Sequence, residues 1–344
     1  MKKVLALIEC PDHVCYRYRI AAFAPAMAER GFALQAVPLR RGVLARSAQL
    51  LAARRADVTV LQRKLLAVAH VRLLRRFAPR LVYDVDDAVF QRDSYHRKGP
   101  HSRKLRVRFR AAVAAADAVI AGNDYLRERV AEHTDPARTH VIPTCVDPGR
   151  YEVAAHRRLG NEVRLAWIGS SSTLQGLNMA GPWLAAVARR CPGLELRLIC
   201  DRSVELPGLR VVLRPWSSDT EAEELAAADI GISWLPDDEF SRGKCGLKVL
   251  QYMAAGLPVV ANPVGVHPQM VVHGGSGLLA STPNEWADAV VRLAADPVLR
   301  ARMGRDGRNR VEQHYSVERW GPQFADLLPR GGRFRLVWTA RNGK

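Results

Sequence analysis

Two lysines and a glutamine near residue 250 have the spacing most indicative of chemistry. Lys244, Lys248 and Gln251 stand at i, i+4 and i+7 in a segment expected to be helical, so their side chains share one helical face. Glycines precede the segment, and the free N–H groups of a helix N-terminus together with two ammonium groups suit a diphosphate. The alternative is an amphipathic helix whose lysines face solvent.

The segment Gly169-Ser170-Ser171-Ser172-Thr173 also has features of a phosphate site. It follows a predicted buried strand and opens a predicted helix. Small residues let the backbone approach a phosphate, and the hydroxyls of Ser170, Ser171 and Thr173 add hydrogen-bond donors. Serine-rich segments are also common helix N-caps. We expect the backbone of this loop to contact phosphate.

Three carboxylates, Asp84, Asp86 and Asp87, end another predicted strand. Their spacing resembles that of phosphatases with an aspartyl nucleophile and of metal-binding carboxylate pairs. Buried carboxylates need cations or solvent. We expect Asp86 and Asp87 to bind an acceptor in a cleft. Purely structural ion pairs, or a Mg²⁺-dependent phosphatase built on Asp84 and Asp86, are the alternatives.

Arg17 and Arg19 follow the first predicted strand. We expect their guanidinium groups to lie at a cleft edge and to contact an acceptor or its phosphate. The alternative is that they face solvent. The 10 histidines include no H-E-x-x-H or similar spacing, so the sequence predicts no metal site.

These residues must be positioned by short apolar runs that alternate with helical stretches along the whole chain. The predicted strands are Val4–Ile8, Phe32–Val37, Val58–Leu61, Leu81–Tyr83, Ala118–Ala121, His140–Ile142, Val163–Ile168, Leu194–Ile199, Val211–Leu213, Ile230–Trp234, Pro258–Ala261 and Gly277–Ala280. Such alternation predicts an α/β fold with two doubly wound, Rossmann-like parallel-sheet domains that face a cleft and join near residues 156–161. Ligands of these sheets bind at the carboxyl ends of the strands.

Several segments resemble glycosyltransferase family 4, the retaining enzymes of the GT-B fold. They include Phe240–Ala261, Pro263–Gly265, Gly274–Leu279 and Trp167–Thr173, and the resemblance covers most of the chain. It implies that residues 1–155 form an acceptor domain and residues 160–312 a donor domain. It also implies that residues 316–328 form a helix that returns to the first domain.

The same resemblance implies roles for individual residues. Trp216 stands where the family stacks its nucleobase, and Gln251 stands where the family has a glutamate that holds the ribose. Gly243 occupies the position of a second family glutamate, which meets the donor sugar. Lys244, Lys248 and Asp87 are the expected catalytic residues.

The resemblance further implies a metal-independent transferase without a separate cofactor. It would move a sugar from a nucleoside diphosphate sugar to a glycan, lipid-linked or small-molecule acceptor, with retention of configuration. A nucleotide-sugar epimerase or hydrolase is an alternative. The loss of both family glutamates favours a further alternative, namely a catalytically inactive protein that binds sugar nucleotides.

The net charge of +18 is concentrated in the first half, where residues 30–110 carry 20 Lys and Arg against 5 Asp and Glu. Leu73, Leu74 and Phe77 interleave with basic residues, as do Leu105, Val107 and Phe109. Such segments suit an anionic membrane surface. The alternative is a composition bias, because 44 of the 52 basic residues are arginine. Nucleic acid is not an expected partner, since no recognition motif is present.

The 6 cysteines form no C-x-x-C pair, and no apolar run is long enough to span a membrane. We expect reduced thiols and a cytoplasmic location, with peripheral attachment at the inner face of the membrane.

Overall fold

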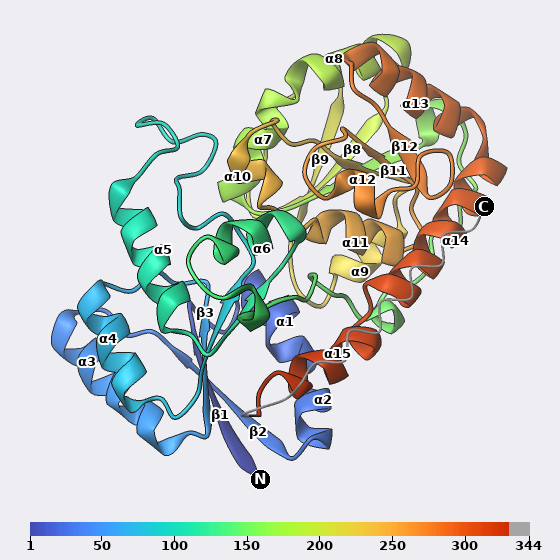
Figure 1. Cartoon of the computed structure of the whole chain (residues 1–344). Helices are drawn as coiled ribbons and strands as arrows, with labels where there is room; N and C mark the ends of the chain where they lie inside the picture. The colour runs from blue at the N-terminus through green and yellow to red at the C-terminus, as the bar shows by residue number, and fades with distance from the viewer. Residues whose placement is uncertain (330–344) are drawn as a thin grey trace.

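The structure is a computed structural model that describes residues 1–329 (Figure 1). It contains two six-stranded sheets, and every strand pair in them is parallel. All the predicted strands are present, with ends that shift by one or two residues. The predicted α/β class with two Rossmann-like domains is therefore confirmed.

The first sheet has the order β2-β1-β3-β4-β5-β6. Its strands are β1 Lys2–Ile8, β2 Phe32–Pro38, β3 Val58–Gln62, β4 Leu81–Val85, β5 Ala118–Ala121 and β6 Thr139–Val141. The helices around it are α1 Val14–Arg19, α2 Ala24–Glu29, α3 Val43–Leu51, α4 Val68–Phe77, α5 Arg103–Ala115 and α6 Asp124–Ala131.

The second sheet has the order β12-β11-β10-β7-β8-β9. Its strands are β7 Arg164–Ile168, β8 Glu195–Cys200, β9 Arg210–Pro215, β10 Ile230–Ser233, β11 Val259–Ala261 and β12 Gly277–Leu279. Its helices are α7 Leu174–Met179, α8 Gly181–Arg190, α9 Glu221–Ala226, α10 Glu239–Arg242, α11 Leu247–Ala254, α12 His267–Met270, α13 Pro283–Ala295 and α14 Pro297–His314.

Alternation of side chains across each strand builds an apolar layer on both faces of each sheet. In β7, Leu165 and Trp167 pack with the layer under α8 and α13, whereas Ala166 and Ile168 pack with the layer under α11. Burial of both faces explains why these strands are nearly continuous apolar runs.

The strand orders determine where ligands can bind. In each sheet the chain reverses its direction of growth beside a central strand, between β1 and β3 in the first sheet and between β7 and β10 in the second. The loops that leave neighbouring strands at such a point diverge and leave a crevice. Residues 63–66 follow β3, and residues 169–173 follow β7. Both segments therefore lie at the binding edge of their sheet.

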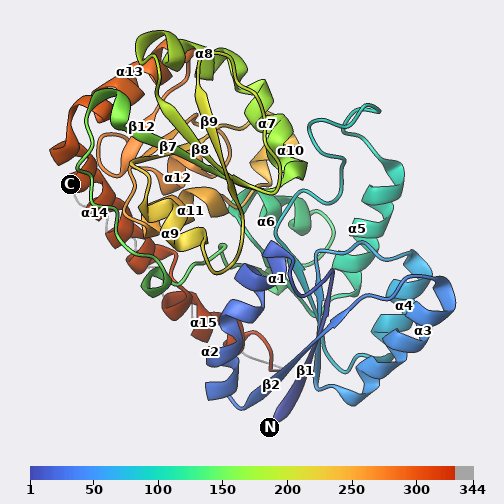
Figure 2. The same ribbon diagram turned by 180° about the vertical axis from the view of Figure 1, so that it is seen from behind.

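After the second domain the chain returns to the first. The final helix α15 (Val317–Asp326) lies beside α2, where the rings of Phe23 and Phe324 stack with centroids 4.8 Å apart (Figures 1 and 2). Among the residues that the structure describes, no helix has the length and apolarity needed to cross a bilayer.

The ring stack predicts that α15 contributes strongly to the stability of the first domain. Phe324→Ala removes a fully buried aromatic side chain and should lower the free energy of unfolding by about 3–5 kcal/mol. Glu318→Ala, on the exposed side of the same helix, is the matched control and should change it by less than about 0.5 kcal/mol. Urea unfolding measures both, and equal effects would contradict this role of α15.

Candidate functional site

The helix that carries Lys248 begins later than the sequence predicts. Gly246, with a positive φ of 65°, precedes α11, so Lys244 lies in the loop between α10 and α11. The prediction that Lys244, Lys248 and Gln251 share one helical face is therefore wrong. The left-handed turn at Gly246 directs the two lysines to different partners.

Lys244 reaches across to the first domain. Its Nζ atom lies 2.9 Å from Oδ2 of Asp87, and the same oxygen accepts a hydrogen bond of 2.7 Å from Arg63. The other oxygen of Asp87 accepts from the N–H of Ala88. Two predicted catalytic residues, one from each domain, are thus brought together in an ion pair.

The backbone around Lys244 packs tightly against the first domain. A Cβ atom added to Gly243 would lie 2.7 Å from Cβ of Ala88 and 2.8 Å from its backbone nitrogen. Asn123 donates to the carbonyl groups of Arg242 and Lys244, at 3.2 and 3.0 Å. This arrangement leaves no room for a side chain at position 243, which explains why glycine occurs there.

Lys248 lies against the loop that follows β7. Its Nζ atom is 3.7 Å from the centroid of the Trp167 ring. A Cβ atom added to Gly169 would lie 2.9 Å from the same Nζ atom. Within residues 1–329 it forms no ion pair. Burial, together with the positive charge of Lys244, lowers the pKa of Lys248 to about 7. A cation held without a carboxylate partner beside a glycine loop is a candidate anion-binding group.

The predicted phosphate loop begins at Gly169, beside this ammonium group. Ser171–Thr173 forms a 3₁₀ turn before α7, and the Ser171 N–H donates to Asp201 at 2.6 Å. Hydroxyls of Ser170 and Ser172 are 2.7 Å apart, and Thr173 donates to the carbonyl of Ser170. A phosphate at this loop would compete with Asp201 for the Ser171 amide.

Gln251 is buried in a cluster of hydroxyl groups. Its Nε2 atom lies 3.2 Å from the hydroxyl of Tyr18 and 3.4 Å from that of Tyr151. Tyr18 belongs to α1 of the first domain and donates to Glu221 at 2.6 Å. The Tyr18 hydroxyl is therefore held between an amide donor and a carboxylate acceptor.

Glu221 is the functional candidate that the sequence analysis missed. It begins α9 and is 3% exposed, and its second oxygen accepts from the indole of Trp216 at 2.9 Å. Trp216 is itself 38% exposed, and the Arg17 guanidinium lies over its ring, 5.3 Å from the centroid. The signal in the sequence was an acidic residue five positions after Trp216.

The two arginines predicted to bind an acceptor differ in position. Arg17 donates to Glu221 at 3.2 Å, so it faces the second domain. Arg19 is 1% exposed, pairs with Asp84 at 2.6 Å and donates to the Ile142 carbonyl. The prediction that Arg19 contacts an acceptor is corrected, because its guanidinium is fully used in the core of the first domain.

The same ion pair argues against the phosphatase interpretation. Asp84 is completely buried beneath Arg19 and cannot meet a substrate. Asp86 is also buried, and one of its side-chain oxygens has no hydrogen-bond partner. Within the described part of the chain, no three His, Cys, Asp or Glu side chains form a group that could hold a metal ion.

Most of the apolar residues predicted at a membrane interface are packed in or against the core of the first domain. Leu74 and Phe109 are buried in the core, and Leu73 and Phe77 pack against it. The first interleaved segment therefore offers no apolar face. Val43, Leu44 and Val107 are exposed large apolar residues in this basic half.

The two sheets and the crevice between their carboxyl edges define a GT-B fold. Solved structures support this class: Anabaena HepE in complex with UDP and glucose superposes with a TM-score of 0.72 over 95% of this chain and 99% of that chain, at 16% identity. Sucrose-phosphate synthase from Thermosynechococcus elongatus gives a TM-score of 0.74 over 95% and 98% of the two chains, at 17% identity.

The sequence comparisons point in the same direction. Residues 155–296 match the family described as Glycosyl transferases group 1, which supports a GT-B glycosyltransferase. D-inositol 3-phosphate glycosyltransferase from Actinosynnema mirum is 30% identical over 232 residues, which cover 58% of this chain and 54% of the relative. The chain thus spans about half the length of the curated relatives that it matches.

The contact at Gly243 predicts a test of how the two domains meet. Gly243→Ala introduces a methyl group against the Ala88 backbone and should open the interface, because backbone atoms cannot yield as a flexible side chain can. Small-angle scattering should then give a larger radius of gyration. Gly181→Ala, where no atom lies within 4 Å, is the control. An unchanged radius in Gly243→Ala would refute the tight contact.

Proposed function

We propose that the protein transfers a sugar from a nucleoside diphosphate sugar to an acceptor hydroxyl, with retention of configuration and without a metal ion. The second domain would bind the donor and the first domain the acceptor. The observation that carries this proposal is Lys248, an ammonium group without a carboxylate partner in the described chain, packed beside Gly169 at the switch point of the second sheet. A diphosphate is the ligand whose charge and size match it.

The ribose would be held by Glu221 together with Gln251. The Tyr18 hydroxyl shows how a hydroxyl fits between them, because it donates to Glu221 and lies 3.2 Å from the Gln251 amide nitrogen. A ribose hydroxyl can replace it if Tyr18 withdraws with its domain. Trp216, bonded to Glu221, would then stack on the base. The acidic group would thus come from α9 rather than from position 251.

Catalysis would depend on charge stabilisation and orientation. Lys248 and the amides of the 169–173 loop would stabilise the departing diphosphate, which is the group that gains charge in the transition state. Asp87, fixed by Arg63 and Lys244, would orient the acceptor hydroxyl. No protein nucleophile is required, and the retaining outcome is tested by the anomeric configuration of the product.

A contact with an anionic membrane remains part of the proposal. Val107 on α5, and Val43 and Leu44 in the first turn of α3, are exposed in this basic half of the chain. Attachment through these residues would hold the acceptor domain near a lipid-linked acceptor at the inner face of the membrane.

The first prediction from this function concerns Lys248. UDP, present in the HepE complex, should bind roughly 10- to 100-fold more weakly to Lys248→Met, because a charge-assisted hydrogen bond contributes about 1.5–3 kcal/mol. In the wild type, UDP affinity should fall as the pH rises above about 7, because the unliganded lysine loses its proton there. Lys248→Arg stays charged and should abolish this pH dependence. Titration calorimetry between pH 6 and pH 9 measures the UDP affinity of the wild type, Lys248→Met and Lys248→Arg.

The nearby groups Lys244, His267 and Cys200 are the other titratable groups that influence Lys248. Burial lowers the pKa of His267 to about 4, so it stays neutral across this range. Turnover assays in excess EDTA accompany the titrations and should retain activity. Consumption of the donor without an acceptor would assign an epimerase or hydrolase. Binding without turnover would assign an inactive binding protein.

The second prediction separates the ribose from the diphosphate. Glu221→Gln should weaken UDP binding about 10-fold while leaving pyrophosphate binding unchanged, since only UDP carries the ribose hydroxyls. Glu223→Gln, an exposed residue on the same helix, is the matched control. If pyrophosphate and UDP weaken together in Glu221→Gln, Glu221 does not hold the ribose.

A further inference from the structure

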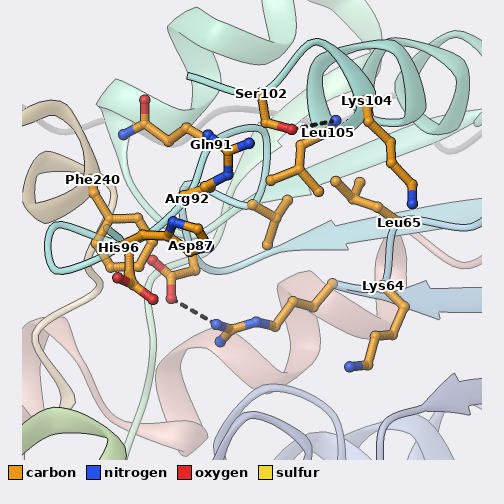
Figure 3. Close-up of a pocket in the computed structure, with 13 residues that line it drawn as sticks. Lys64, Leu65, Asp87, Gln91, Arg92, His96, Ser102, Lys104, Leu105 and Phe240 are labelled. Atoms are coloured by element: carbon orange, nitrogen blue, oxygen red, sulfur yellow. Dashed lines mark hydrogen bonds and ion pairs between the residues drawn. The ribbon is translucent and has the colours of Figure 1, made fainter. Parts of the chain in front are cut away.

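A cavity lies in front of Asp87, on the side of the first domain. It has a volume of about 580 Å³, within the range of small-molecule sites. Phe240 of the second domain closes one side, and the loop after β3 and the start of α5 form the other (Figure 3). It is therefore adjacent to the Asp87–Lys244 ion pair but distinct from the donor loop at Gly169.

Most of the charged side chains that line this cavity are cationic, and their partners differ. Arg63 is bonded to Asp87, and Arg92 donates to three backbone carbonyls of the loop that follows it. Lys64 forms an exposed ion pair with Glu9 at 2.5 Å. Lys104 forms no ion pair or hydrogen bond with any residue from 1 to 329. The cavity therefore holds one ammonium group that no acid of the described chain neutralises.

The arrangement of these groups separates the cavity into two ends. Figure 3 shows Lys64 and Lys104 together at the end away from Phe240, with Asp87 at the opposite end. Lys104 lies in the first turn of α5, a helix of 13 residues capped by Ser102. The positive end of the helix dipole adds to the charge of the two lysines. A ligand that bridges the ends meets the ion-paired carboxylate of Asp87 at one end, and at the other the exposed, unpaired Lys104 beside the Lys64–Glu9 pair.

We propose that this cavity is an acceptor subsite for a phosphorylated acceptor. The phosphate would bind Lys104 and Lys64 at the start of α5, and the reacting hydroxyl would lie at Asp87. Lysines bind phosphate as point charges, and a helix N-terminus supplies further donors. The inference rests on the proposed glycosyl transfer, because that reaction gives Asp87 its role. The phosphate can belong to a soluble sugar phosphate or to a lipid, since the group recognised is the same.

The test compares phosphorylated and neutral probes with UDP saturating the donor site. Glucose 6-phosphate should bind at least about 10-fold more tightly than glucose to the wild type. Lys104→Gln should reduce this preference to within about twofold. Arg106→Gln removes one charge from an exposed position of the same helix that does not line the cavity, and should leave the preference intact. Melting temperatures confirm that both variants fold.

A second arm uses phosphatidylcholine vesicles with and without phosphatidic acid. Binding that depends on phosphatidic acid and is lost in Lys104→Gln but not in Arg106→Gln would assign the phosphate to a lipid. Equal losses in the two variants would mean general charge attraction and would overturn the proposal. So would the absence of a phosphate preference in both arms.

The donor site is tested separately in the same samples. If the wild type does not bind UDP, the proposed function is contradicted. The subsite is then tested by titrating glucose 6-phosphate and glucose without UDP. A preference for glucose 6-phosphate that survives Lys248→Met but not Lys104→Gln would still support the subsite. A preference that is lost in Lys248→Met but kept in Lys104→Gln would show phosphate bound at the donor loop, and would overturn it.

Discussion

The structure of the site depends on the contact between Gly243 and Ala88. Because a Cβ at 243 would lie 2.7 Å from the Ala88 methyl group, only glycine allows this segment to meet the first domain. Asn123 then holds the neighbouring carbonyls, and Lys244 reaches Asp87. The close approach brings a loop of the second domain, after β10, against a loop of the first domain, after β4. A glutamate at position 243 would be incompatible with this arrangement.

Acidic and basic side chains near the domain interface differ in whether they have partners of opposite charge. Asp87 is neutralised by two cations, whereas Lys248 and Lys104 have no carboxylate partner within residues 1–329. Burial of an unpaired ammonium group opposes its protonated form, which is why the pKa of Lys248 falls to about 7. An anion bound beside Lys248 would offset that penalty, so the buried lysine favours anion binding, whereas Lys104 is exposed and has no such penalty.

The cluster around Glu221 brings together polar groups from both domains. The amide of Gln251 and the carboxylate of Glu221 meet at the same hydroxyl group, although they come from α11 and α9. Tyr18, from the other domain, occupies the position between them. A nucleoside that binds there must displace this contact, which would couple donor binding to the separation of α1 from the second domain.

The sequence by itself determined the twelve strands, their parallel arrangement and the loops at their carboxyl ends, because apolar periodicity and Gly or Pro signals act over a few residues. It also predicted that Lys248 and the 169–173 loop bind phosphate, and this stays a prediction. Only the tertiary structure decided that Arg19 is buried in an ion pair with Asp84, that Lys244 leaves the helix for Asp87, and that Glu221 and Gln251 meet at the Tyr18 hydroxyl. The Arg19–Asp84 contact joins residues 65 positions apart within the first domain. The others join residues 157 or more positions apart, and they form only because the two domains pack against each other.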